Sequence, residues 1–122
     1  MAYSQKLKTS KPKYTTISLS SSTTTAEIDL EGGTLCALKL PELTSTTFTI
    51  TWCEQSGGTF VTLKDWLGAY TTAGSAITFT IGATSLGGGT FPPALTAGLR
   101  FIKIVFDSSE TADIIVVKRN ID

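Results

Sequence analysis

Apolar and polar residues alternate along most of this chain, in short runs separated by turn-forming residues. The alternation is cleanest in residues 46–54, where threonines alternate with Phe48, Ile50 and Trp52, and it recurs in residues 77–81. Successive side chains of a β-strand point to opposite faces, so a period of two predicts half-buried strands. The full set of predicted strands is 14–19, 27–30, 34–40, 46–54, 60–63, 69–72, 77–81, 100–106 and 114–118.

The segments between these runs carry turn and loop signals. Residues 20–25 are polar and of low complexity, and they predict a loop or an edge. Residues 55–58 predict a tight turn and residues 65–68 a bend, because glycine and small polar residues favour such conformations. Residues 83–90 contain three consecutive glycines and predict a mobile loop, and residues 91–95 predict one short helical turn.

The last two predicted strands are apolar on both faces, which indicates a central position in a sheet. We expect residues 100–106 and 114–118 to be joined by a polar hairpin loop at residues 107–111. Short strands at this spacing are typical of a sandwich. The pattern therefore predicts an all-β fold, a two-sheet antiparallel β-sandwich of jelly-roll-like form with eight or nine strands.

Composition supports one domain of this class. The chain has 122 residues, which fits a single core, and 41% apolar with 16% charged residues excludes a disordered chain. Threonine and the β-branched and aromatic residues are abundant, and these favour strands over helices. We expect residues 14–122 to form the sandwich domain and residues 1–13 to form an extended N-terminal arm.

The arm is basic and the rest of the chain is acidic. The arm contains no acid and carries four of the ten basic residues, leaving six basic against ten acidic residues in the remainder. These four residues are Lys6, Lys8, Lys11 and Lys13. Such an arm can lie on an acidic partner, including a neighbouring copy, or can be a solvated terminus. Nucleic acid is the weakest option because the acidic domain would repel phosphate.

Targeting signals and cysteines bear on the compartment. No run of 18 apolar residues is present and no apolar segment follows the first lysines, so we expect neither a membrane span nor a secretory signal. Strand phase places Cys36 on the core face with Leu38, and Cys53 on the face opposite Phe48. Two free thiols and folding in the cytoplasm are the expectation.

The residues available for catalysis argue against an enzyme. The chain has no histidine, which removes the commonest general base and metal ligand. The glycine clusters are not followed by the Lys-Ser/Thr pair of a phosphate-binding loop. Two cysteines on opposite faces make a zinc site improbable. No catalytic residue, metal or cofactor is therefore expected.

Two groups of carboxylates have alternative interpretations. Glu27, Asp29 and Glu31 share one face of a predicted strand and could bind calcium, but the downstream glycine and glutamate of a calcium loop are missing. A solvated strand face that discourages edge pairing is the simpler interpretation. Glu54 and Asp65 could form a glycosidase pair, although two carboxylates in turn regions explain them as well.

Three further residues are candidates for surface roles. Trp66 and Tyr70 flank a predicted bend, where an exposed aromatic could stack on a sugar or contact a protein partner, and core or edge packing is the alternative. Arg100 precedes a buried strand, and it could cap the end of that strand or pair with an acid.

Three stretches together resemble a family of small structural proteins of tailed bacteriophages. The first has leucines at 35 and 38 followed by Pro41, the second is a hairpin that includes Ser56-Gly57-Gly58-Thr59-Phe60, and the third is Arg100-Phe101-Ile102-Lys103. The similarity extends over residues 30 to 106. The hairpin and the arginine-aromatic strand are also similar to discoidin-type, galactose-binding-like jelly rolls, whose paired terminal cysteines this chain lacks.

The resemblance implies a non-enzymatic virion protein, folded in the host cytoplasm and attached to the capsid as a cement or decoration subunit. The implied partner is the major capsid protein or another virion protein, bound by many copies or a homo-oligomer, without a membrane. The alternatives are a carbohydrate-binding adhesion module and a tail-associated receptor-binding component. The candidate interface residues are the four arm lysines together with Trp66 and Tyr70.

Overall fold

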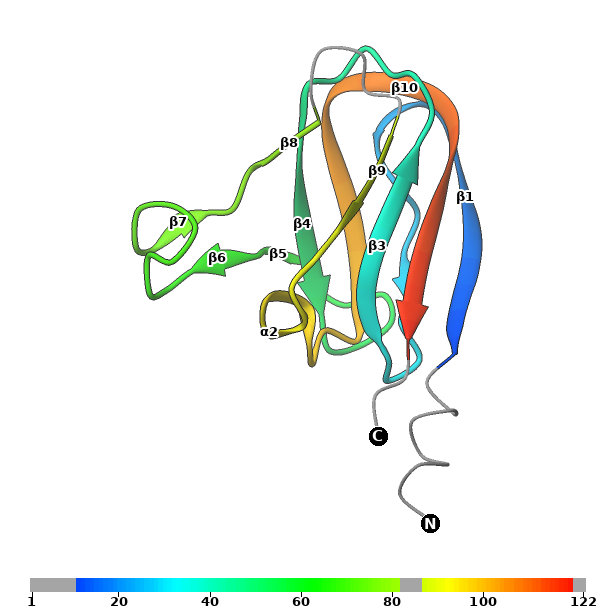
Figure 1. Cartoon of the computed structure of the whole chain (residues 1–122). Helices are drawn as coiled ribbons and strands as arrows, with labels where there is room; N and C mark the ends of the chain where they lie inside the picture. Colours follow the sequence, from blue (N-terminus) through cyan, green and yellow to red (C-terminus); the bar gives the residue numbers. More distant parts are fainter. Residues whose placement is uncertain (1–10, 82–86, 120–122) are drawn as a thin grey trace.

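The computed structural model describes residues 11–81 and 87–119; residues 1–10, 82–86 and 120–122, and the side chains of residues 93 and 94, are not described. Strands dominate the described chain, and one four-residue helix interrupts them (Figure 1). The elements are β1 (Pro12–Thr24), β2 (Ile28–Asp29), β3 (Thr34–Leu40), β4 (Thr47–Cys53), β5 (Val61–Thr62), β6 (Lys64–Asp65), β7 (Ser75–Ala76), β8 (Phe79–Thr80), β9 (Gly87–Thr90), α2 (Pro93–Thr96) and β10 (Phe101–Arg119). The predicted all-β class is therefore confirmed.

The long strand β10 organises the main sheet. It arches over one end of the molecule, so that its two halves run in opposite directions (Figure 1). Residues 101–106 pair with β4, and residues 115–119 pair with β3. β1 follows the second half of β10 in antiparallel register, and β2 pairs with the first half. The result is one curled antiparallel sheet of eight strands, with β6 and β7 forming a separate two-stranded sheet.

We expected two sheets packed face to face. In the described residues, the strands of the body instead belong to one hydrogen-bonded sheet, because β10 is continuous through its bend. The hairpin loop predicted at residues 107–111 is accordingly wrong. This polar stretch stays in the strand because Asp107 and Glu110 accept hydrogen bonds from the chain that leads into β4. The carboxylates of Asp107 and Glu110, which would favour a turn, thus accept hydrogen bonds from the loop between β3 and β4.

The core lies inside the curl. Side chains from both halves of β10 enter it, including Ile104 and Ile114, which are completely buried. The strand keeps a period of two on each side of the bend, so alternate residues face the core throughout. Phe48, Phe79 and Phe91 form an aromatic cluster at one end, with the rings of Phe48 and Phe79 stacked at 4.9 Å.

The predicted phases of both cysteines are wrong. The pairing of β3 with β10 shifts register between Val117 and Lys118, and this bulge turns Leu35 into the core while Cys36 becomes half-buried. At the end of β4, the alternation breaks after Trp52, which is half-buried, and Cys53 is buried instead. Both thiols are free.

Several strand boundaries also differ from the expectation. β1 begins at Pro12, two residues before the predicted domain start. It ends at Thr24, so it includes most of residues 20–25, which were predicted to form a loop or an edge. Residues 69–72 do not form a strand, and Gly87–Thr90 forms β9 where a loop was predicted. The short helical turn near residues 91–95 is confirmed as α2, which is tied to β3 by a hydrogen bond from Thr96 Oγ1 to the Leu35 carbonyl.

Candidate partner-binding hairpin

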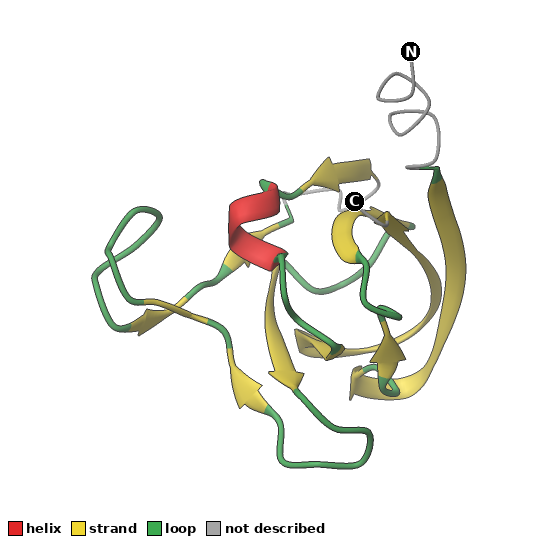
Figure 2. Ribbon diagram, turned by 90° about the horizontal axis from the view of Figure 1, so that it is seen from below, coloured by secondary structure: helices red, strands yellow, loops and turns green. Residues whose placement is uncertain are grey.

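The β6–β7 hairpin, residues 64–76, projects from the side of the curled sheet (Figures 1 and 2). Its two strands pair with each other and, among the described residues, with no other strand. β5 and β8, which lead into and out of the hairpin, both pair with β4. The hairpin is therefore anchored to the sheet at both ends, while its loop stands away from the body.

Asp65 holds the loop in one conformation. One carboxylate oxygen accepts hydrogen bonds from the backbone N–H groups of Gly68 and Ala69 at 2.8 and 3.1 Å. The other accepts from those of Tyr70 and Thr71 at 2.6 and 2.9 Å. The hydrogen bond from the Tyr70 N–H is the largest cause that lowers the pKa of Asp65, and it outweighs the opposing effect of burial. The carboxylate is thus ionised at neutral pH and organises four consecutive amides.

The loop that Asp65 organises presents large apolar side chains to solvent. Leu67 is 92% exposed, Trp66 75% and Tyr70 55%. The Lys64 ammonium lies 5.8 Å from the centre of the Trp66 ring, at cation–π distance. Exposed apolar side chains gathered on one loop are a common feature of surfaces that contact a partner.

Two hollows lie where the loop meets the body. One groove, of about 630 Å³, lies between Trp66 and the side chains of Trp52 and Phe60. A pocket of about 330 Å³ is lined by residues of the loop, including Tyr70, and by Leu95 of α2. A partner that covers the tip of the hairpin would therefore meet further apolar surface next to it.

The structure brings only part of the predicted interface together. Trp66 and Tyr70 lie on the same hairpin and are both exposed, which was one of the two alternatives for them. Lys11 and Lys13 are exposed at the start of β1, which lies on the opposite side of the molecule from β6 and β7 in both views. Lys6 and Lys8 lie outside the described residues. The lysines and the aromatics therefore do not form one surface.

The three carboxylates that follow β1 each have a separate structural partner. Asp29 pairs with Arg100 at 3.1 Å, and Glu31 pairs with the buried ammonium of Lys118 at 2.7 Å. Glu27 accepts two hydrogen bonds from the turn that follows β4. Arg100 is thus paired with an acid, one of its two predicted roles. Within residues 11–81 and 87–119, no group of three or more Cys, Asp or Glu residues could hold a metal ion.

The second carboxylate pair has different environments at its two members. Glu54 is exposed in the turn after β4, whereas Asp65 is buried with both oxygens accepting backbone hydrogen bonds. A carboxylate occupied in this way is not free to protonate or attack a substrate. Its function is to fix the loop.

Sequence reasoning missed Leu67 and the structural role of Asp65. An aspartate followed three residues later by a glycine, as Asp65 is by Gly68, is a signal for a side chain that caps a loop. Aspartate readily accepts hydrogen bonds from the backbone amides of the next few residues. Leu67 carries no such signal, because a single leucine in a short segment usually packs inward.

Comparisons with known proteins add no relative. No protein-family model, no curated protein and no solved structure matches this chain. No helix in the described part of the chain is long and apolar enough to cross a membrane.

Proposed function

We propose that this chain is a non-enzymatic structural protein of a tailed-phage virion, a cement or decoration subunit that binds the assembled shell through the β6–β7 hairpin. The observation that carries the proposal is the fixed exposure of Trp66, Leu67 and Tyr70 on a loop held by Asp65. The resemblance of the strand and hairpin motifs to small phage structural proteins supplies the virion context.

The geometry suits protein binding for two reasons. Tryptophan and tyrosine are the side chains that most often dominate the binding energy of protein interfaces. A loop already held in its bound conformation loses little conformational entropy when it binds. Binding by one small hairpin is weak for a single copy, and many copies on a repeating lattice can stabilise the shell together.

A carbohydrate-binding module is the second candidate, because two exposed aromatic rings on one hairpin can also serve as stacking platforms for sugar rings. The two functions differ in what the partner must be. A sugar-binding site depends on Trp66 or Tyr70 stacking on a glycan, whereas a protein interface also uses the aliphatic Leu67.

The test mixes the purified protein with phage particles that lack it and, separately, with a glycan array. Trp66→Ala, Leu67→Ala and Tyr70→Ala are compared with Tyr14→Ala, a control that removes a 69% exposed aromatic from β1. Saturable particle binding that is weakened by the three hairpin changes and unaffected by the control supports the proposal. Glycan binding lost in Trp66→Ala or Tyr70→Ala, without affinity for particles, would favour the carbohydrate-binding module.

A further inference from the structure

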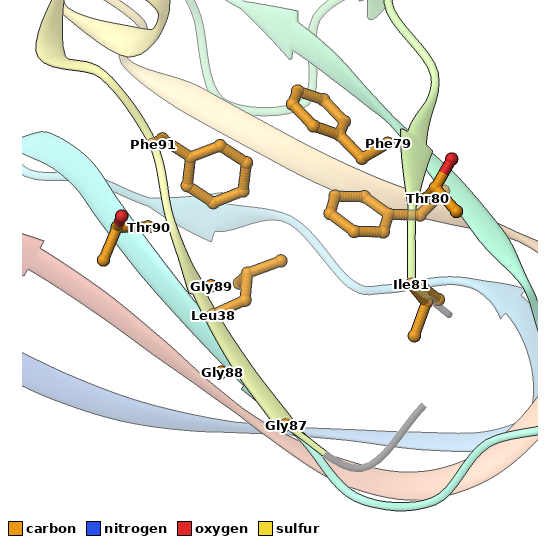
Figure 3. A pocket seen from close by; sticks show the side chains of 10 residues that line it. Leu38, Phe79, Thr80, Ile81, Gly87, Gly88, Gly89, Thr90 and Phe91 are labelled. Atoms are coloured by element: carbon orange, nitrogen blue, oxygen red, sulfur yellow. The ribbon is translucent and has the colours of Figure 1, made fainter. Parts of the chain in front are cut away.

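A separate opening, away from the hairpin tip, lies between the edge strands β8 and β9 (Figure 3). It is a pocket of about 360 Å³ whose floor includes Phe48, Phe79 and Phe91, with Leu38 beside them. Among the described strands, β8 pairs with β4 alone and β9 pairs with β3 alone. Within the described residues, the curled sheet is therefore open here, with aromatic side chains visible between two strand edges (Figure 3).

The rim of this opening includes three consecutive glycines, Gly87 to Gly89. Neither the backbone conformation nor the packing of the described residues requires glycine at these positions. None of the three has the positive φ that would require glycine. A Cβ atom at Gly87 or Gly89 would meet nothing within 4 Å, and one at Gly88 would make ordinary contacts. Glycine weakens a strand, and in a strand it often marks the place where another backbone approaches closely.

An extended polypeptide segment fits these features. The free edge of a strand offers N–H and C=O groups to an added strand. The pocket beside it would accept an apolar side chain from one face of that segment, and the absence of side chains on Gly87–Gly89 keeps the rim of the pocket open to it.

The chain contains a segment with the matching pattern. Residues 1–10 lie outside the described residues, and their sequence puts Tyr3 and Leu7 in one strand phase and Lys6 and Lys8 in the other. Leu7 could enter the pocket while both lysines stay in water. Ten extended residues span about 33 Å, enough to reach a neighbouring molecule.

The position of β1 favours a second copy over the same molecule. β1 starts with Pro12 opposite Arg119, and β10 and β3 separate it from β9 in the sheet. The segment would have to cross both strands to reach the pocket of its own molecule. In an assembly, by contrast, a neighbouring pocket is present at high effective concentration.

We propose that the N-terminal segment of one copy adds as a strand to β9 of the next copy, with Leu7 in the pocket between β8 and β9. This linkage goes beyond the proposed function, because it joins copies of the chain to one another and does not depend on the shell contact. It gives the basic arm a partner within the assembly, separate from the shell contact at the hairpin.

The test measures self-association of the full chain by analytical ultracentrifugation, without particles. Gly89→Val adds a side chain at the rim of the pocket, where a Cβ meets nothing in the fold, and so occupies space that Leu7 would need. Leu7→Asp removes the apolar side chain from the arm. Thr16→Val is the control, because it places the same side chain at an exposed position of β1. We expect both test variants to weaken association about tenfold or more, and the control to leave it unchanged.

Mixing the two weakened variants tests the direction of the contact. Leu7→Asp keeps an intact pocket and Gly89→Val keeps an intact arm, so the mixture should form heterodimers at concentrations at which each variant alone is mostly monomeric. A wild-type chain that stays monomeric at the highest concentration, or a Gly89→Val chain that associates like wild type, would overturn the proposal. Because no particle is involved, either result leaves the hairpin contact to be judged by its own test.

Discussion

The backbone N–H of Tyr70 donates a hydrogen bond of 2.6 Å to the buried carboxylate of Asp65, five residues earlier in the chain. Three neighbouring amides donate to the same carboxylate, so one side chain sets the course of the loop. The aromatic and aliphatic side chains at the tip of the hairpin are therefore exposed in a defined arrangement. This relationship joins the fold to the proposed function.

Replacement of Asp65 by alanine should release the loop. We expect faster amide hydrogen exchange at residues 68–71, weaker particle binding, and little change in exchange within β10, because the loop packs outside the core. Asp113→Asn is the matched control, since Asp113 is exposed and accepts a hydrogen bond from the Ser18 hydroxyl. Unchanged exchange at residues 68–71 in Asp65→Ala would show that the carboxylate does not hold the loop.

Acid should destabilise the fold through carboxylates that accept several hydrogen bonds. Burial of Glu110 opposes its ionisation, but hydrogen bonds from Ser45 and Thr44 outweigh it and lower the pKa of Glu110 below the ordinary 4.5. Burial likewise opposes the ionisation of Asp107, but hydrogen bonds from amides and hydroxyls of residues 45–47 outweigh it. They lower the pKa of Asp107 below the ordinary 3.8.

A lowered pKa in the folded state sets the direction of the pH dependence. The stability contributed by these acids is fully present above their unfolded pKa values, and it is lost as pH falls through the lower folded values. The thermal midpoint should therefore fall as the pH is lowered below about 4.5, and Glu110→Gln should show a smaller fall than wild type. An equal acid dependence in the variant would exclude Glu110 as a contributor.

The two thiols should differ in reactivity in the folded protein. Cys53 is 1% exposed and Cys36 is half-buried, so a thiol reagent should modify Cys36 first and reach Cys53 only after opening of the fold. Denaturation should make both thiols reactive. Equal rates for the two thiols in the native protein would contradict the burial of Cys53.

The close packing of Cys53 against Gly58 makes a separate prediction. A Cβ atom at Gly58 would lie 2.5 Å from the Cys53 sulfur, so Gly58→Ala should lower the free energy of unfolding by about 1–3 kcal/mol. Gly87→Ala is the control, because its Cβ meets nothing within 4 Å. Chemical denaturation of both variants measures the difference, and equal stabilities would mean that the turn rearranges freely.

The alternating pattern was sufficient to predict the all-β class and the centres of β3 and β4. It could not predict the continuity of β10, because residues 107–111 have the composition of a turn and remain in the strand through long-range hydrogen bonds to residues 44–47. It also failed at both cysteines, where a bulge in the pairing of β3 and the end of β4 interrupt the period of two.

The candidate site was predictable in part for the same physical reason. The bend near Gly68 and its flanking aromatics are local features, and they identified Trp66 and Tyr70. The projection of the β6–β7 hairpin depends on where β5 and β8 pair with β4, which is a long-range property. The distance between the basic start of β1 and the hairpin is likewise set by sheet topology.

The contact proposed for the tip of the hairpin is with a virion protein. Its most direct measurement places a photo-reactive amino acid at Leu67 in one variant and at Tyr14 in another, binds each to particles that lack the protein, and irradiates them. We expect a covalent product between position 67 and a shell protein, with little or none from position 14. Cross-linking from position 14 with none from position 67 would contradict it.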